Sequence, residues 1–312
     1  MGKQHPFRFG LNTSASSREA WIDKAQRAEA SGYDTLLVSD HLNVPFAPFA
    51  ALVAAADATT TLRVGSYVFG NDFRHPVYLA REAATIDKFS EGRFDLGLGT
   101  GWLRSDYEMS GIPLDRPGVR VSRLTEAVQI IKGFFAEGPF TFTGKYYTVR
   151  NLKGTPKSIQ RPYPPLMLGG GGQRMLSLAA READIVSVNA KTTAAGGLNF
   201  GSLTAEAAAQ KVAWVRQAAG QRFDDLTLNI LVPLVAITDK RHQAAEQMLQ
   251  QWNVPESILS VEQVLESPSA LIGTVDQIVE DLQARRERYG FSYIVVWAME
   301  EFAPVVERLA GR

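Results

Sequence analysis

Residues 62–102, LRVGSYVFGNDFRHPVYLAREAATIDKFSEGRFDLGLGTGW, decide the fold. The stretch opens with the mostly apolar run LRVGSYVFG and closes with a second run, RFDLGLG. Hydrophobicity that is continuous instead of alternating is typical of parallel strands that are covered on both faces. The segment between the two runs has room for one helix, so the stretch predicts a strand–helix–strand unit of a parallel sheet.

The same alternation of apolar runs and helical segments continues through the chain. Six further runs begin elsewhere: FRFGLN near Phe7, TLLVSD near Thr35, LMLGG near Leu166, DIVSVN near Asp184, TLNILVPLVAIT near Thr227 and FSYIVVWA near Phe291. Segments between the runs repeat apolar residues at the spacing of a helix. Eight strands that alternate with helices predict an α/β fold, the (β/α)8 TIM barrel. A doubly wound open sheet is the competing fold.

Two intervals between the apolar runs are too long for a single helix. Residues 139–165 contain FTFTGKYYTV, which is typical of a β-hairpin, and residues 239–274 form the second long interval. We expect both to be insertions on the barrel, after strands 4 and 7. Residues 1–312 are therefore predicted to form a single domain.

The composition is typical of a globular enzyme. Of the 312 residues, 45% are hydrophobic, and 33 Lys and Arg balance 33 Asp and Glu, so no net charge attracts nucleic acid or a membrane surface. The chain has no cysteine, which excludes disulfides, thiolate metal sites and a cysteine nucleophile. No apolar stretch approaches 18 residues, and the start MGKQHPFRFG lacks an apolar targeting core. We expect a cytoplasmic protein with no nucleic-acid or membrane partner.

The catalytic candidates stand where a barrel strand ends, because barrel chemistry is built by the loops that follow the strands. The second predicted strand ends in Ser39-Asp40-His41. A histidine can exchange a proton near neutral pH, and an aspartate can accept hydrogen bonds from a bound ring or anchor a loop. Neighbours on an extended chain point to opposite sides, so Asp40 and His41 should face different partners. The simpler alternative is that both residues only close the strand.

Glycines interrupt the third and fourth predicted strands. Gly65 and Ser66 in the third strand indicate a bulge or the close approach of a ligand. Gly97, Gly99 and Gly101 in the fourth strand lack the spacing of a dinucleotide fingerprint. We expect them to leave a flat wall for a planar ring, with Trp102 at its edge.

Four consecutive glycines, Gly169 to Gly172, follow the fifth predicted strand in PPLMLGGGGQRML (residues 164–176). A helix is predicted to begin near Gly172 or Gln173. Free N–H groups at a helix N-terminus bind anions, and glycine lets a phosphate approach the backbone. The turn therefore predicts a phosphate site, and a merely flexible turn is the alternative.

Several stretches, taken in order, resemble the bacterial luciferase-like superfamily, specifically its coenzyme F420-dependent oxidoreductases. They are Asp-His after strand 2, FRHPVYLAREAATIDKFSEGRFDLGLGTGW (residues 73–102), TGKYYTV, SIQRPYPPLMLGGGG, IGTVDQIVEDL and EFAPVVERL. The similarity covers nearly the whole chain. It implies a barrel that binds a flavin or 5-deazaflavin with its ring over the barrel mouth, and a homodimer.

The resemblance also assigns residues. It implies a non-prolyl cis peptide under the ring at Ser66-Tyr67, and His41 matches the active-site histidine of the family. Trp102 stands where the sugar-phosphate dehydrogenase branch has an acid, which argues against sugar-phosphate oxidation. The expected cofactor-binding residues are Ser66, Tyr67, Gly99, Thr100, Gly101, Gly169, Gly170, Gly171, Gly172 and Gln173.

The sequence thus predicts hydride transfer between coenzyme F420 and a small organic substrate. Asp40, His41 and Trp102 are the expected catalytic residues: His41 handles the proton, while Trp102 and Tyr67 help to hold the substrate. A reduced-FMN monooxygenase on the same scaffold is the close alternative. A Schiff-base aldolase that uses Lys191 and a non-catalytic cofactor carrier are the alternatives from other classes. No metal site is expected.

Overall fold

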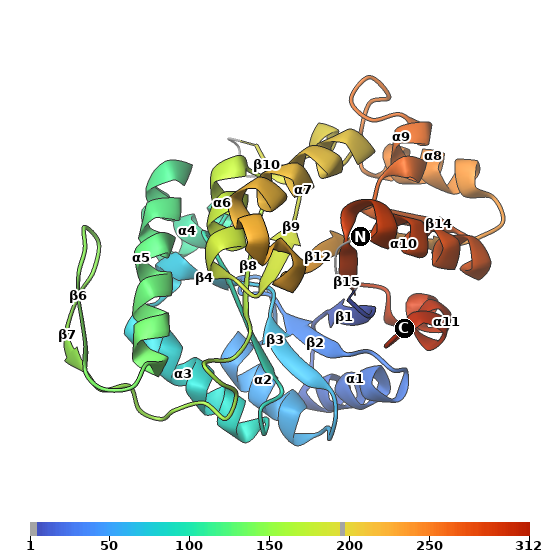
Figure 1. Cartoon of the computed structure of the whole chain (residues 1–312). Helices are drawn as coiled ribbons and strands as arrows, with labels where there is room; N and C mark the ends of the chain where they lie inside the picture. The colour runs from blue at the N-terminus through green and yellow to red at the C-terminus, as the bar shows by residue number, and fades with distance from the viewer. Residues whose placement is uncertain (1–4, 194–196) are drawn as a thin grey trace. The chain divides into compact units, whose positions relative to one another are not determined.

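The computed structural model describes residues 5–193 and 197–312 (Figure 1). Within this range, nine strands form one sheet in the hydrogen-bonded order β3-β2-β1-β15-β12-β9-β8-β5-β4, and a further pairing of β3 with β5 closes it. These strands are β1 (Arg8–Asn12), β2 (Thr35–Val38), β3 (Arg63–Ser66), β4 (Phe69–Gly70), β5 (Phe94–Gly99), β8 (Leu166–Gly170), β9 (Ile185–Val188), β12 (Thr227–Val232) and β15 (Phe291–Val296). Because β3 and β4 are two parts of one interrupted strand, eight parallel strands close the barrel. The predicted (β/α)8 TIM barrel is confirmed, and the open sheet is excluded.

The strands form where the apolar runs predicted them. β2, β5, β9 and β15 are buried at every position. Parallel strands inside a barrel are covered on both faces, which explains why their sequences are mostly apolar and do not alternate with exposed polar residues.

The chain folds into two compact units, which are described separately. The β2–β8 unit comprises Thr13–Arg27 and Leu36–Leu168, and the β9–β15 unit comprises the described parts of Met1–Asn12, Ala28–Thr35 and Gly169–Arg312. Helix α1 (Arg18–Ala30) contributes to both. The prediction of a single domain over residues 1–312 stays a prediction.

The β2–β8 unit carries the first predicted insertion. Its helices are α2 (Pro48–Asp57), α3 (Pro76–Phe89), α4 (Arg104–Ser110) and α5 (Pro117–Phe135), and its hairpin consists of β6 (Phe140–Thr143) and β7 (Thr148–Leu152). Figure 1 shows the hairpin beside α5. Glu126 of α5 accepts backbone hydrogen bonds at 2.7, 2.8 and 3.1 Å from the three residues 145–147 at the hairpin turn. The carboxylate of Glu126 thus holds the hairpin turn on the helix.

The β9–β15 unit carries the second insertion. Its further elements are α6 (Gln173–Glu182), β10 (Lys191–Thr192), β11 (Leu198–Asn199), α7 (Ala205–Ala219), β13 (Leu234–Ile237), α8 (Arg241–Gln251), α9 (Val261–Glu266), β14 (Ala270–Gly273), α10 (Val275–Tyr289) and α11 (Met299–Leu309). The predicted strand TLNILVPLVAIT is split at Pro233, because proline cannot donate to a strand ladder. Its second half, β13, leaves the barrel and pairs with β14. These two strands share a small apolar core with α8 and α9.

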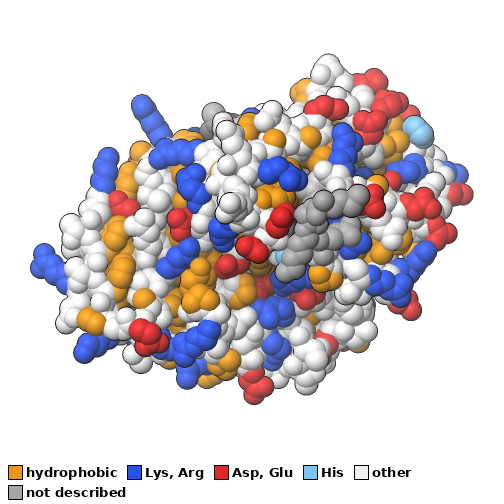
Figure 2. All heavy atoms as spheres, in the orientation of Figure 1, with side chains coloured by type: hydrophobic (Ala, Val, Ile, Leu, Met, Phe, Trp, Pro, Cys, Tyr) orange, Lys and Arg blue, Asp and Glu red, His pale blue; other side chains and the backbone are white. Residues whose placement is uncertain are grey.

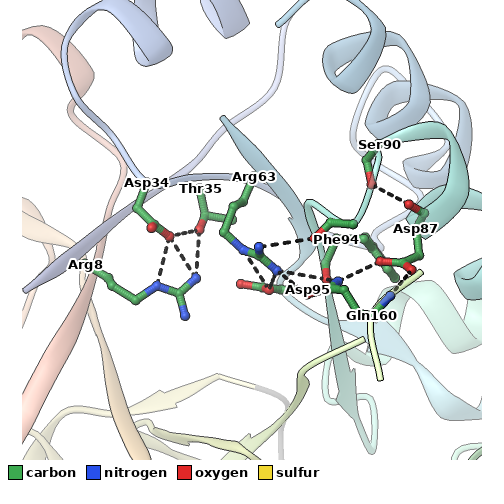
Figure 3. Close-up of polar contacts among 10 residues, drawn as sticks. Arg8, Asp34, Thr35, Arg63, Asp87, Ser90, Phe94, Asp95 and Gln160 are labelled. Atoms are coloured by element: carbon green, nitrogen blue, oxygen red, sulfur yellow. Dashed lines mark hydrogen bonds and ion pairs between the residues drawn. The ribbon is translucent and has the colours of Figure 1, made fainter. Parts of the chain in front are cut away.

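Polar contacts tie the first residues of the barrel strands to their neighbours (Figure 3). In the β9–β15 unit, Arg8 Nε donates to Asp34 Oδ2 at 2.9 Å. In the β2–β8 unit, Arg63 donates to Asp95 Oδ1 and to Gln160 Oε1, both at 3.1 Å. These contacts lie at the N-terminal ends of the strands, where barrels are stabilised, and not at the ends that carry chemistry.

The surface matches the balanced composition. On the face shown in Figure 2, Lys and Arg side chains are interspersed with Asp and Glu side chains. Among the helices of the described residues, none combines the length and the apolar character needed to span a bilayer.

Candidate active site

The third barrel strand breaks at a non-prolyl cis peptide between Tyr67 and Val68. Ser66 Oγ donates to the carbonyl oxygen of Gly97 at 2.8 Å and accepts from its N–H at 2.9 Å. The N–H of Tyr67 still donates to Val38 O at 2.8 Å. Neighbouring strands therefore hold the chain as far as Tyr67. The cis peptide expected at Ser66-Tyr67 was predicted one residue too early.

The bulge formed by Ser66–Val68 packs against the glycines of β5. A methyl group on Gly97 would lie 2.0 Å from the carbonyl oxygen of Ser66, and one on Gly99 would lie 2.5 Å from Val68 Cγ2. The expectation that these glycines leave a flat open wall was wrong. Their missing side chains make room for the bulge itself, and Gly99 packs against the side chain of Val68.

The turn after β5 is held by buried groups. Gly101 has φ +73°, and a methyl group there would lie 2.0 Å from the hydroxyl oxygen of Tyr107. That hydroxyl lies 3.1 Å from both Asp72 Oδ2 and Thr100 O. Burial, and then the charge of Asp72, raise the pKa of Tyr107, so its hydroxyl stays a donor. Arg120 also donates to the carbonyl oxygens of Thr100 and Gly101. The predicted ligand residues Thr100 and Gly101 thus have clear structural partners within the protein.

His41 lies just after β2 and is paired with an acid that the sequence analysis missed. Its Nδ1 lies 2.7 Å from Asp106 Oδ2, and the other oxygen, Oδ1, accepts the N–H of Leu42 at 3.1 Å. Asp106 is 2% exposed. The His41 ring meets the Trp102 ring edge-on, with centroids 5.7 Å apart, and Trp102 is 38% exposed. The structure therefore brings His41 and Trp102 together, as expected for two residues of one site.

Asp40 faces other partners, which confirms that the two neighbours diverge. Both of its carboxylate oxygens accept hydrogen bonds from Arg74, and Oδ2 also accepts the N–H of Gly70 at 2.9 Å. The Arg74 guanidinium lies over the ring of Phe49, 4.7 Å from the centroid. Of the two roles considered for Asp40, these contacts fit the anchoring of a loop better than contact with reactants.

In the β9–β15 unit, the glycines that follow Leu168 differ in what surrounds them. A methyl group on Gly169 would lie 2.5 Å from Ser187 Cβ, and one on Gly171 would lie 2.4 Å from Ala190 O. At these two positions, neighbouring parts of the chain occupy the space that a side chain would need. A methyl group on Gly172 would meet nothing within 4 Å. Gly172 is also the N-cap of α6, where no side chain caps the helix, so the space in front of this helix start is open.

The lysine proposed for a Schiff base is exposed. Lys191 lies on the short strand β10, with Nζ 5.6 Å from the ring centroid of Trp214. The buried lysine nearby is Lys211 of α7, whose Nζ donates to Asn189 O at 2.9 Å and Ser202 O at 2.7 Å. Burial, and then the charge of Lys191, lower the pKa of Lys211 to about 8. Because the amine of Lys211 is committed to two carbonyl oxygens and Lys191 is exposed, the structure favours neither residue as a nucleophile.

Comparison with known proteins links this geometry to one family. The sequence model described as luciferase-like monooxygenase matches residues 2–292. An F420-dependent glucose-6-phosphate dehydrogenase of Intrasporangium calvum is 30% identical over 175 residues, which are 52% of this chain and 51% of the relative. An FMNH2-dependent dimethylsulfone monooxygenase of Pseudomonas putida is 27% identical over 194 residues, 59% of this chain and 52% of the relative. The chain thus spans about half the length of these two relatives.

An uncharacterized protein of Mycobacterium tuberculosis is 29% identical over 197 residues, 56% of this chain and 67% of the relative. Among solved structures, the coenzyme F420-dependent tetrahydromethanopterin reductase of Methanopyrus kandleri superposes with a TM-score of 0.77 at 19% identity, over 98% of both chains. The monooxygenase RslO1 of Streptomyces bottropensis superposes with a TM-score of 0.73 at 21% identity, over 97% of both chains. At these identities the structural likeness shows the fold alone.

Proposed function

The chain belongs to the luciferase-like monooxygenase family, and from this premise we propose that it transfers a hydride between coenzyme F420 and a small organic substrate. Named relatives in the comparisons are oxidoreductases that depend on F420 or on reduced FMN. The protein is therefore an enzyme of this oxidoreductase family. The choice of F420 and of hydride transfer is the proposal.

The observation that carries the proposal is the joining of three segments within the β2–β8 unit. Ser39 Oγ, at the end of β2, donates to the carbonyl oxygen of Tyr67 in the bulge at 3.3 Å. Two residues after Ser39, His41 meets Trp102 from the turn after β5. A bulged strand, a histidine with a buried acid and a half-exposed tryptophan thus stand together at strand ends, where barrel enzymes act.

Each unit, taken by itself, has features that suit a deazaflavin. The bulge at Tyr67–Val68 would lie against the ring, and Trp102 would hold the substrate beside His41. In the β9–β15 unit, the open N-terminus of α6 at Gly172 and Gln173 would hold a phosphate through backbone N–H groups. The bound deazaflavin would supply or accept the hydride. The protein orients the substrate and moves the accompanying proton at His41.

We favour F420 over FMN because the pair of His41 and Asp106 suits a proton transfer that accompanies hydride transfer. Hydride exchange with an alcohol or carbonyl moves one proton to or from oxygen, and His41 with Asp106 behind it is suited to that step. A reduced-FMN monooxygenase is the second candidate, because it is the activity named for the relative from Pseudomonas putida.

Titration of the purified protein with each cofactor tests the proposal. Oxidised F420 should lose fluorescence on binding, with an affinity in the micromolar range or tighter, about −8 kcal/mol. FMN should bind more weakly. Saturable binding of FMN alone, with rapid oxygen consumption once it is reduced, would overturn the proposal in favour of the monooxygenase.

The partners remain proposals as well. We propose a homodimer that binds a small-molecule substrate and neither nucleic acid nor membrane. Sedimentation of the full chain, with and without F420, measures its mass directly, and a monomer at micromolar concentration would contradict the dimer.

A further inference from the structure

Asp106 is oriented toward His41 by its own helix. Helix α4 buries two consecutive side chains, Asp106 and Tyr107, and exposes Arg104 and Glu108. The Tyr107 hydroxyl lies within hydrogen-bond distance of Asp72 Oδ2 and of the carbonyl oxygen of Thr100. These contacts anchor the helix next to the turn that follows β5. The carboxylate of Asp106 is therefore placed by the fold, and the histidine meets a fixed acceptor.

The contacts of Asp106 determine which nitrogen of His41 carries hydrogen. Both oxygens of the carboxylate act as acceptors: Oδ1 takes the N–H of Leu42 at 3.1 Å, and Oδ2 lies 2.7 Å from Nδ1 of His41. An ionised carboxylate has no hydrogen to donate, so Nδ1 must donate. In the neutral ring, Nε2 then carries the lone pair.

We infer that Asp106 is a positioning residue that holds His41 in the Nδ1–H tautomer and leaves Nε2 as the atom that exchanges the proton with the substrate. When an alcohol is oxidised, its carbon loses a hydride to the cofactor and its hydroxyl proton passes to Nε2. In the reverse direction, a carbonyl carbon gains the hydride and its oxygen takes the proton from Nε2. Trp102 lies edge-on to the ring, with the two centroids 5.7 Å apart. The part of this inference that concerns turnover rests on the proposed function; the tautomer does not.

Nitrogen-15 NMR of the histidine-labelled protein tests the tautomer without any cofactor. The chain has four histidines, so the spectrum of His41→Asn identifies the signals of His41. Neutral His41 should show a protonated Nδ1 and an unprotonated Nε2. In Asp106→Asn the side-chain amide can donate to Nδ1, so the ring should move toward the Nε2–H form. Asp106→Glu, which keeps both acceptor oxygens, should retain the original tautomer.

Glu108→Gln is the matched control, because Glu108 is an acid of the same helix with a 66% exposed side chain. It should leave the His41 signals unchanged. A neutral His41 in the Nε2–H form, or an Asp106→Asn spectrum like that of the parent, would overturn the inference. If Asp106→Asn does not fold, the parent and Asp106→Glu decide: the Nδ1–H form in both proteins supports the inference, and its absence from the parent, or its loss in a folded Asp106→Glu variant, would overturn it.

Single-turnover hydride transfer then separates this inference from the proposed function. Asp106→Asn should bind F420 normally and transfer hydride about 10²- to 10⁴-fold more slowly. If the tautomer responds as expected but the parent binds no F420, the proposed function fails and the positioning of His41 stands. A changed tautomer with an unchanged rate of hydride transfer would overturn the assigned role of Nε2.

Discussion

Ser66 and Gly97 clamp two neighbouring barrel strands together, because one hydroxyl both donates to and accepts from the same glycine, at 2.8 and 2.9 Å. The carbonyl oxygen of Ser66 also occupies the place where a methyl group on Gly97 would stand, at 2.0 Å. The bulge formed by Ser66–Val68 therefore depends on glycine at this position of β5.

Gly97→Ala should destabilise the fold. Overpacking typically costs about 1–3 kcal/mol, and a clash with backbone should reach the upper end of that range or exceed it. Denaturant unfolding measures the change. Gly172→Ala is the control, since its methyl group meets no atom within 4 Å. Equal stability of the two variants would contradict the packing described for the bulge.

Gly172→Ala should instead weaken the binding of the cofactor. The residue has φ −105° and ψ 149°, which alanine adopts without strain, so the loss of stability should be limited to that of a poorer N-cap, about 1 kcal/mol or less. A methyl group at the helix start would hinder a phosphate, and we expect F420 affinity to fall about tenfold or more, roughly 1.4 kcal/mol. An unchanged affinity for F420 would show that this turn does not bind the phosphate.

His41→Ala should separate binding from chemistry. The side chain is partly exposed and lies beyond β2, so the protein should fold and take up F420. Single-turnover hydride transfer should slow by roughly 10²- to 10⁴-fold, and its pH dependence should lose one limb. Weaker binding with an unchanged pH profile would show instead that His41 only contacts the ring.

Arg74→Met should destabilise the protein through Asp40. The carboxylate of Asp40 is 8% exposed, and removal of its partner leaves a charge without compensation, at a cost of about 3 kcal/mol. Arg104→Met is the control: its pair with Glu108 is long, at 3.9 Å, and both side chains are more than half exposed, so little should change. Comparable unfolding midpoints for both variants would argue against the anchoring role of Asp40.

Lys211 should make stability depend on alkaline pH. Burial lowers its pKa from the ordinary 10.5 to about 8, so between these values the unfolded chain binds more protons than the folded chain. Stability should therefore rise with pH across this window, by up to about 3 kcal/mol. Denaturant unfolding from pH 7 to pH 10.5 should show the rise for the parent relative to Lys211→Met. A constant difference between the two proteins would contradict the lowered pKa.

The order of strands and helices could be read from the sequence by itself. β2 and β5 are mostly apolar and buried at every position because barrel strands are covered on both faces, and the apolar residues of the helices between strands recur at helical spacing. These signals are local, so no partner residue is needed to recognise them. The divergence of Asp40 and His41 followed from the same local rule that strand neighbours point to opposite sides.

Only the tertiary structure decided what fills the space around those strands. The glycines of β5 look alike in sequence whether a ligand or the neighbouring bulge occupies the space, and here the bulge occupies it. The cis peptide lies between Tyr67 and Val68, and the Tyr67 N–H donates to Val38 on another strand, a contact that the sequence does not show. Asp106 meets His41 across 65 positions of sequence, and a pairing between such distant residues leaves no periodic or local trace. The fold is set by patterns along the chain, whereas the site is set by which distant segments come into contact.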